Sequence, residues 1–199
     1  NEFARMSIGE LEQRTAAGDT KAQAELGVRY GKGEGVEKNL EKAIDLLKDA
    51  ATKGEPEAEF FLGTAYYSGL GVPQSFIEAI MQFEKAAAKG HAAAQYWLAV
   101  QIKDGRGGIS PNWEAAIPLL WKSAMQGYGD AEFLLGSAYQ MGTGVERNVS
   151  AAAYWYRRNL SKQKNLRSFY NLSMLINEGQ VKWRPGDHKD LKKPDTQVY

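Results

Sequence analysis

Apolar residues recur at helical spacing through most of the chain. Between residues 54 and 89, one set follows the i, i+3, i+4, i+7, i+8 spacing of a single buried helix face. Its members are Ala58, Phe61, Leu62, Ala65 and Tyr66. After a glycine-rich interval, a second stripe consists of Ala79, Phe83, Ala86 and Ala87. The pattern predicts two amphipathic helices joined by a tight turn, which are called helix A and helix B.

The A and B pair is predicted to repeat along the chain. Its landmarks recur from Gly18, Gly54, Gly90 and Gly127, at a spacing of 36 or 37 residues. A fixed period of this size, with two helices per unit, is typical of an α-solenoid. We therefore expect an all-α fold, wound as a right-handed superhelix in one elongated domain. Its expected parts are a capping helix at 6–17, repeats at 18–53, 54–89, 90–126 and 127–163, a partial repeat at 164–179, and a non-repeat tail at 180–199.

Residues between the stripes predict where the helices begin and end. Glycines suit the positive backbone angles of a tight reversal, and a pair follows each A helix: Gly33/Gly35, Gly69/Gly71, Gly105/Gly107 and Gly142/Gly144. Predicted N-caps are Asp19, Asn39, Ser75, Asn112 and Asn148. Ser75 and Glu78 also match the S-x-x-E capping box.

One position in the middle of each A helix carries only small residues. They are Gly27, Gly63, Ala99, Gly136 and Ser173. A glycine there costs about 1 kcal/mol relative to alanine. Its repeated use indicates close approach of a neighbouring helix backbone.

These landmarks spell the string LGxxY…GxGV…A…AA, which resembles the Sel1-like repeat, a relative of the tetratricopeptide repeat. The string is nearly complete in the units that contain Leu26-Gly27, Leu62-Gly63 and Leu135-Gly136. The third unit departs from it at Ala99 and Ile102, and the fourth replaces the final alanines by Asn159-Leu160. The resemblance covers residues 6 to 179. It implies a scaffold that binds another protein.

Composition narrows the functional classes. The chain is 43% hydrophobic and 25% charged, with a net charge of +1. This near-neutral balance argues against nucleic acid, whose phosphates need a concentrated basic surface. No apolar run reaches the roughly 20 residues of a membrane span. The first residue is Asn1, so we expect that a preceding segment was removed.

The absence of cysteine excludes disulfides and thiolate metal sites. It also sets the chain apart from the cysteine-rich relatives. Because many Sel1-like proteins are exported to the bacterial envelope, the resemblance favours the periplasm over the cytoplasm.

Groups that could support catalysis are sparse. The two histidines, His91 and His188, lie far apart in sequence, and no hydrolase or zinc-binding motif is present. Glu55, Glu57 and Glu59 cluster at a helix start, where carboxylates complement the helix dipole, and are interpreted as a solvated face. We expect no enzyme activity, no cofactor and no metal.

The resemblance also places candidate binding residues, because A helices of such repeats line a concave face. Those expected to point into it are Phe60, Thr64, Tyr67, Tyr96, Val100, Lys103, Phe133, Ser137, Gln140, Tyr170 and Asn177. Four of them, Phe60, Tyr96, Phe133 and Tyr170, form an aromatic ladder along the groove, and exposed aromatics are typical of interface cores. The alternative is that they pack against the A helix of the next repeat.

Three further features have two interpretations each. The connector at 105–111 is either a lengthened surface turn or a means for Arg106 to reach a partner. Trp155 and Tyr156 either pack internally or contact a partner. The tail either covers the last helix through Trp183 or binds a partner.

Three functional classes follow. The first is an adaptor or inhibitor that holds a partner protein in its groove; one form is a bacterial immunity protein that blocks a secreted toxin such as a phospholipase effector. The second is a structural or regulatory adaptor of the bacterial cell envelope. The third is an enzyme like the cysteine-rich relatives, to which β-lactamase activity is attributed.

Overall fold

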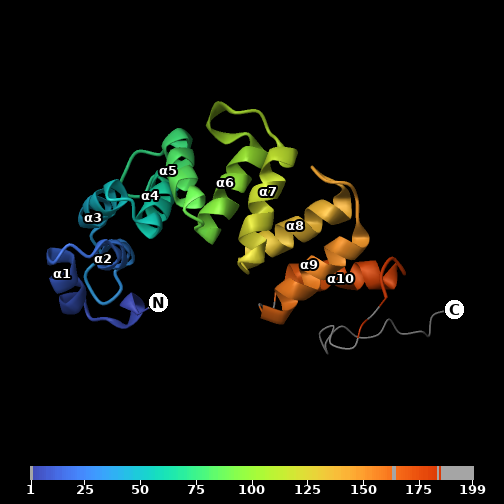
Figure 1. Cartoon of the computed structure of the whole chain (residues 1–199), viewed down its shortest axis with the longest axis horizontal. Helices are drawn as coiled ribbons and strands as arrows, with labels where there is room; N and C mark the ends of the chain where they lie inside the picture. The colour runs from blue at the N-terminus through green and yellow to red at the C-terminus, as the bar shows by residue number, and fades with distance from the viewer. Residues whose placement is uncertain (1, 163–164, 183, 185–199) are drawn as a thin grey trace. The chain divides into compact units, whose positions relative to one another are not determined.

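The computed structural model describes residues 2–162, 165–182 and 184 (Figure 1). These residues form α-helices and two 3-10 turns, and no strand occurs among them. The all-α prediction is therefore confirmed. The helices are α1 (Ile8–Ala16), α2 (Thr20–Lys32), α3 (Leu40–Thr52), α4 (Pro56–Ser68), α5 (Phe76–Ala88), α6 (Ala92–Asp104), α7 (Trp113–Met125), α8 (Gly129–Met141), α9 (Val149–Lys162) and α10 (Leu166–Asn177). The 3-10 turns are η1 (Phe3–Arg5) and η2 (Arg106–Gly108).

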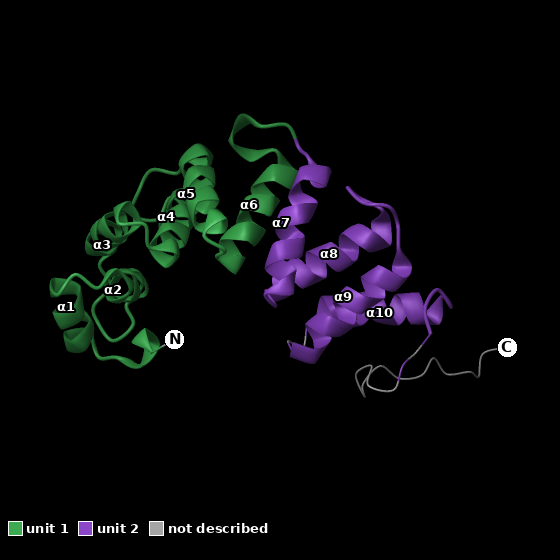
Figure 2. Ribbon diagram, viewed as in Figure 1, with its two compact units in different colours: residues 1–110 green, residues 111–199 purple. Residues whose placement is uncertain are grey.

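The chain divides into two compact units (Figure 2). Unit 1 contains residues 1–110 and unit 2 contains residues 111–199. Within unit 1, α2 packs on α3 and α4 on α5 as helix hairpins, and α8 packs on α9 in the same way within unit 2. The right-handed superhelix and the single continuous domain stay predictions, because they are properties of the whole array rather than of either unit.

The predicted N-caps are in place. The carboxylate of Asp19 accepts hydrogen bonds from the backbone N–H groups of Lys21 and Ala22, both at 3.1 Å. The side chains of Asn39, Ser75, Asn112 and Asn148 each accept the backbone N–H three residues later. A reciprocal capping box closes the start of α1, where Ser7 and Glu10 bond to each other's backbone N–H. Local polar residues therefore set the helix starts.

Glycine pairs end the A helices as expected. At the end of α4, Gly69 has φ +71° and Gly71 has φ +75°, a conformation that side chains with a Cβ rarely adopt. The N–H of Gly69 donates to the Ala65 carbonyl at 2.8 Å. The other three predicted pairs also have positive φ. The helix reversal is thus built into the repeat.

The small-residue position accommodates a ring from helix B. A Cβ added at Gly63 would lie 2.7 Å from Cε1 of Phe83, and one at Gly136 would lie 2.7 Å from Cε1 of Tyr156. The backbone carbonyl of Ala79 is farther, at 3.3 Å from the Gly63 position. The expected close approach is present, but the prediction that a backbone makes it was wrong for these two glycines. An aromatic ring fills the space that the missing side chain leaves.

The helix expected in the partial repeat is α10, and it packs on α9. Leu172 and Leu175 of α10 join Tyr156 and Leu160 of α9 in one buried cluster. Asn159, which replaces an alanine of the repeat string, is fully buried. Its amide donates to the Gly129 carbonyl at 2.8 Å, and its oxygen accepts from the Ser168 hydroxyl at 2.7 Å. Three helices of unit 2 are thereby joined at one side chain.

The hydroxyl of Tyr156 lies at the centre of this packing. It donates to Gln140 at 2.7 Å and accepts from the Asn171 amide at 3.0 Å. Burial raises the pKa of the Tyr156 phenol above its ordinary value of 10.0, against the opposing effect of hydrogen bonds from Asn171 and Ser137. The folded state therefore favours the neutral phenol.

We expect Tyr156→Phe to reduce the alkaline sensitivity of folding. Because the pKa of Tyr156 is raised on folding, its contribution to stability is complete below the unfolded pKa of about 10 and declines as the pH rises further. At neutral pH the variant should lose about 1 kcal/mol of unfolding free energy through the lost hydrogen bonds. Urea titrations at neutral pH and above pH 10 should show this difference shrinking at the higher pH. Tyr154→Phe, at an exposed neighbouring position, is the control and should show neither effect.

Candidate protein-binding groove

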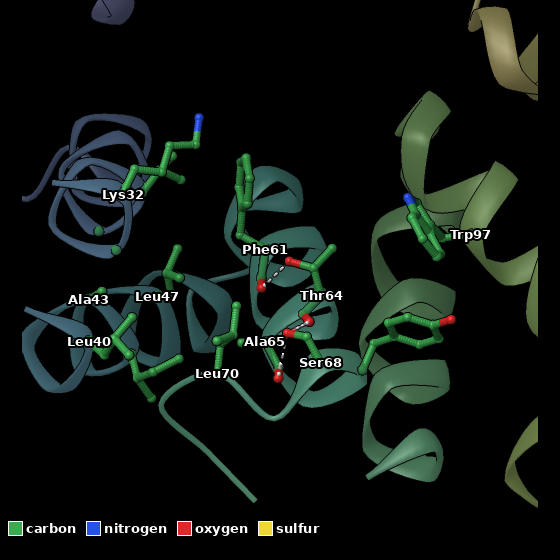
Figure 3. Close-up of a pocket in the computed structure, with 15 residues that line it drawn as sticks. Lys32, Leu40, Ala43, Leu47, Phe61, Thr64, Ala65, Ser68, Leu70 and Trp97 are labelled. Carbon is green, nitrogen blue, oxygen red and sulfur yellow. Dashed lines mark hydrogen bonds between the residues drawn. The ribbon is translucent and has the colours of Figure 1, made fainter. Parts of the chain in front are cut away.

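An apolar groove opens in unit 1 between the first two repeats (Figure 3). Its cavity volume is about 410 Å³, which lies in the range of ligand and peptide pockets. Helices α2 and α3 supply one side, α4 supplies the other, and Trp97 of α6 extends it. The lining residues are Gly27, Val28, Gly31, Lys32, Leu40, Ala43, Ile44, Leu47, Phe61, Thr64, Ala65, Tyr67, Ser68, Leu70 and Trp97.

Two aromatic rings of the groove are held by their neighbours. The ring centroids of Tyr67 and Trp97 are 5.2 Å apart, and Trp97 also stacks at 6.3 Å on Phe83. The guanidinium of Arg106 lies 5.5 Å from the Tyr67 ring and 5.2 Å from the Phe76 ring. Contacts on several sides restrict the rotation of these rings, so less entropy is lost when they receive a partner.

The aliphatic hydroxyl groups of the groove, on Thr64 and Ser68, bond to the helix that carries them. Thr64 donates to the Phe61 carbonyl at 2.7 Å and Ser68 donates to the Thr64 carbonyl at 2.8 Å, as Figure 3 shows. The groove therefore presents mainly carbon surface. Among the described residues that line it, only Lys32 is charged, with Nζ 6.0 Å from the Phe61 ring and 3.5 Å from a carboxylate oxygen of Glu34.

In unit 1, the structure separates the predicted site residues into two groups. Thr64 and Tyr67 line the groove. Phe60 is half-buried, because its ring stacks at 4.7 Å on His91 and lies 6.0 Å from Phe83 of its own repeat. The other predicted residues of this unit, which are also half-buried and do not line the groove, are Tyr96, Val100 and Lys103.

In unit 2, three predicted residues contact Tyr156. The Phe133 and Tyr156 rings are 6.0 Å apart, Gln140 accepts the Tyr156 hydroxyl, and Ser137 hydrogen-bonds to the same side chain. Tyr170 and Asn177 are exposed. Phe60 and Phe133 thus pack on helix B of their own repeats. The aromatic ladder as one binding surface stays a prediction.

Several groove residues were not among the predicted site residues. Phe61 was assigned to the buried seam of helix A but lines the groove, and α3, a B helix, contributes lining residues that were not expected. The lining residues that were not predicted as site residues are Gly27, Val28, Gly31, Lys32, Leu40, Ala43, Ile44, Leu47, Phe61, Ala65, Ser68, Leu70 and Trp97. Exposed Leu70, which sits between the two turn glycines, was the clearest available signal.

The interpretation of the Glu55, Glu57 and Glu59 cluster as a solvated face was wrong for Glu59. This side chain is 3% exposed and pairs with Lys89, whose Nζ is 2.5 Å from its Oε1. The equivalent Glu132, which is fully buried, pairs with Arg158 at 2.9 Å and Lys162 at 3.4 Å. Each pair joins the start of an A helix to the end of its B helix. These carboxylates therefore act in repeat packing.

Side-chain positions bear on two alternatives from the sequence. Arg106 lies over Tyr67 and Phe76 of its own chain, so the interpretation of the connector as an intramolecular turn is favoured. Trp155 and Tyr156 are buried, as the packing interpretation predicts. The prediction for Trp183 lies outside the described residues.

The described part of the chain contains no cluster of side chains that could hold a metal ion and no helix that could cross a membrane. Across residues 2–162, 165–182 and 184, no three acidic or histidine side chains converge to hold a metal ion. Nor does any helix in these ranges have the length and apolar content to span a bilayer. His91 caps α6 through Nδ1 and lies 3.1 Å from Glu57.

The fold and the groove define a helical-repeat scaffold. The Sel1 repeat profile matches residues 20–55, 56–91, 92–128 and 129–158, and the chain therefore belongs to the Sel1 repeat family. Each matched segment begins at the first residue of α2, α4, α6 or α8. The profile thus starts two residues after the repeat starts predicted from the sequence.

Solved structures with the same fold include three bacterial proteins. The chain is 34% identical to c5321, described as a protective antigen present in uropathogenic Escherichia coli strains; the match has a TM-score of 0.80 and covers 88% of this chain and 37% of that chain. A Sel1 repeat protein from Oxalobacter formigenes is 27% identical, with a TM-score of 0.80 and coverage of 96% and 73%. Immunity protein Pa5087 from Pseudomonas aeruginosa is 24% identical, with a TM-score of 0.57 and coverage of 90% and 64%. No curated protein matches the sequence closely enough to suggest a role.

Proposed function

We propose that this Sel1 repeat chain is a non-catalytic scaffold whose unit 1 groove binds an apolar segment of another protein. The observation that carries the proposal is the open apolar groove, in which Tyr67 and Trp97 are fixed by their neighbours. Aromatic side chains in a concave apolar surface are the usual anchors of protein recognition. The near-neutral charge supports a protein rather than a nucleic acid as the partner.

Lys32 suggests the chemistry of the bound segment. Its side chain is exposed at the end of the groove, beside the Phe61 ring. A partner with a carboxylate next to its apolar side chains would place that charge near the ammonium, which favours the correct orientation. We therefore expect an apolar segment that carries an acidic residue or ends in a free carboxylate.

A peptide selection tests this function without a known partner. Short random peptides displayed on phage would be selected on the full chain, and the affinity of the selected peptides would be measured by calorimetry. We expect apolar sequences with an acidic residue. Trp97→Ala should weaken them about 30-fold, because a buried aromatic anchor is worth about 2 kcal/mol.

Two further variants make the selection decisive. Lys32→Gln removes the charge at an exposed position and only one exposed ion pair, with Glu34. It should therefore change the free energy of unfolding by well under 1 kcal/mol and weaken acidic peptides. Lys48→Ala, on the exposed side of α3, should change nothing. Peptides that bind all four proteins equally, or that show no acidic preference, would contradict the proposed site.

A narrower hypothesis makes the partner a secreted toxin, such as a phospholipase effector, and the chain its immunity protein. The likeness to immunity protein Pa5087 supports a shared fold and carries no information on the partner. The direct test is inhibition of purified effectors encoded beside the gene in its host. An envelope adaptor would inhibit none of them and would instead co-purify with cell-wall or secretion components.

A further inference from the structure

Helix α10 carries an exposed apolar stripe on the side away from α9. Leu166, Tyr170 and Met174, spaced four residues apart, are 81%, 63% and 37% exposed. The opposite side, with Leu172 and Leu175, is buried in the cluster shared with α9. Figure 2 shows α10 as the last labelled helix of unit 2, with α9 beside it. Three large, exposed apolar side chains on one helix face are typical of an interaction surface, which another structural element or molecule buries.

Two other repeats show what packs at the position of Tyr170. The residue of α4 equivalent to Tyr170 is Phe60, whose ring lies 6.0 Å from Phe83 of the following helix. In α8 it is Phe133, whose ring lies 6.0 Å from Tyr156 of the following helix. In both repeats a packed helix lies against this position. After α10, no further helix occurs among the described residues.

The described residues that follow α10 lead to other surfaces. The Lys182 carbonyl accepts from Arg157 of α9 at 2.9 Å, and the Gln180 amide oxygen accepts from Arg147 at 2.9 Å. Val181 packs against the cluster shared by α9 and α10. These described residues after α10 therefore do not bury Leu166, Tyr170 or Met174.

Two charges flank the stripe and point to its partner. At 100° per residue, Arg167 and Glu178 project on the same flank, next to Met174, about three turns apart along the helix. Neither forms an ion pair with any described residue; Glu178 accepts only the amide of Gln180 at 2.7 Å. Their order opposes the helix dipole, which prefers anions at the start and cations at the end. Their placement is therefore not explained by the stability of α10 itself.

We propose that α10 binds α10 of a second copy of the chain, antiparallel across a two-fold axis. Such an interface uses the same surface on both copies. Tyr170 of each copy then lies beside Met174 of the other, and Arg167 of each lies beside Glu178 of the other. In an antiparallel helix pair related by a two-fold axis, a given flank of one helix faces the same flank of the other helix. Arg167 and Glu178 lie on one flank, so the two symmetry-related Arg167–Glu178 ion pairs form together. The stripe itself, Leu166, Tyr170 and Met174, carries no charge, so the two copies bring no like charges together along it.

Sedimentation velocity over a concentration series tests the proposal. The full chain should form a dimer as the concentration rises. Tyr170→Glu should remain a monomer with an unchanged melting temperature, because Tyr170 is exposed in the single chain. A wild-type chain that stays monomeric throughout the series would overturn the proposal, and the stripe would then be covered by the chain's own C-terminal residues or by a different protein.

Charge reversals test the antiparallel register. Arg167→Glu and Glu178→Arg should each weaken the dimer about tenfold, because two rim pairs become repulsive. Each single reversal improves the match to the helix dipole, so a weaker dimer cannot result from a less stable α10. The double variant should regain the wild-type dissociation constant. Lys48→Glu is the control for net charge and should have no effect. Failure of the double variant to recover would overturn the antiparallel arrangement.

Discussion

Gly63→Leu is expected to lower the free energy of unfolding by about 3 kcal/mol, although leucine is the better helix former. Even a bare Cβ at this position would lie 2.7 Å from Cε1 and 2.8 Å from Cδ1 of Phe83. The Phe83 ring is fully buried and has little room to move. Gly136→Leu should behave alike, because Tyr156 occupies the same position. Chemical denaturation of each variant gives the measurement.

Matched substitutions separate overpacking from helix propensity. Gly31→Ala adds a Cβ 3.6 Å from the Cβ of Ala43, an ordinary contact, and should stabilise α2 by about 0.5–1 kcal/mol. Gly63→Ala should destabilise. Leu120 and Ala99 occupy the positions of Phe83 and Gly63 in the third repeat, so Gly63→Ala with Phe83→Leu should recover part of the loss. Equal stability of Gly63→Leu and the parent would disprove the role of the ring contact.

Lys89→Met should cost about 2 kcal/mol, because it leaves the buried Glu59 carboxylate without its cation. Lys89 also donates to the Gly54 carbonyl at 2.8 Å, so two groups lose their partner. The loss should stay below that of a fully buried pair, since Lys89 is 39% exposed and partly screened by solvent. Urea titrations at low and moderate salt would measure both the loss and its screening.

The chain supplies two controls for this pair. Lys53 occupies the same position one repeat earlier but pairs with the exposed Asp49 and donates to the amide oxygen of the neutral Gln23 at 3.2 Å. Because Lys53→Met leaves no buried charge unpaired, it should cost about 1 kcal/mol, less than Lys89→Met. The third repeat has Gln95 and Gln126 at the positions of Glu59 and Lys89. Adding Glu59→Gln to Lys89→Met should therefore restore most of the lost stability. If the double variant is no more stable than Lys89→Met, the uncompensated charge is not the cause.

The period, the turns and the caps could be predicted because each depends on residues within a few positions. Asp19, Asn39 and Gly69 act through backbone groups in the next or preceding turn, and helical spacing reveals the stripes directly. Contacts between distant residues were less accessible. Glu59 looks like a solvated first-turn carboxylate until its cation, 30 positions later in the sequence, is placed beside it.

The groove was only partly predictable for a related reason. An apolar residue such as Phe61 or Leu47 has the same sequence signature whether a neighbour covers it or leaves it open. The presence of Thr64 and Tyr67 in the groove could be inferred from helical spacing, because both residues project away from the buried face of helix A. The contribution of α3 and of Trp97 depends on how consecutive helices are angled, which the periodicity does not encode.

Asn159 has a consequence for how unit 2 unfolds. Its buried oxygen has a hydrogen-bond donor only while Ser168 of α10 is docked, and its amide is used by α8. If α10 detached, this oxygen would lose its partner and the apolar contacts of Leu172 and Leu175 would be lost as well. Terminal helices of repeat proteins commonly fray first. Here the extra cost of an unsatisfied polar atom ties the last helix to its neighbours, so α8, α9 and α10 should exchange their amide hydrogens as one cooperative unit.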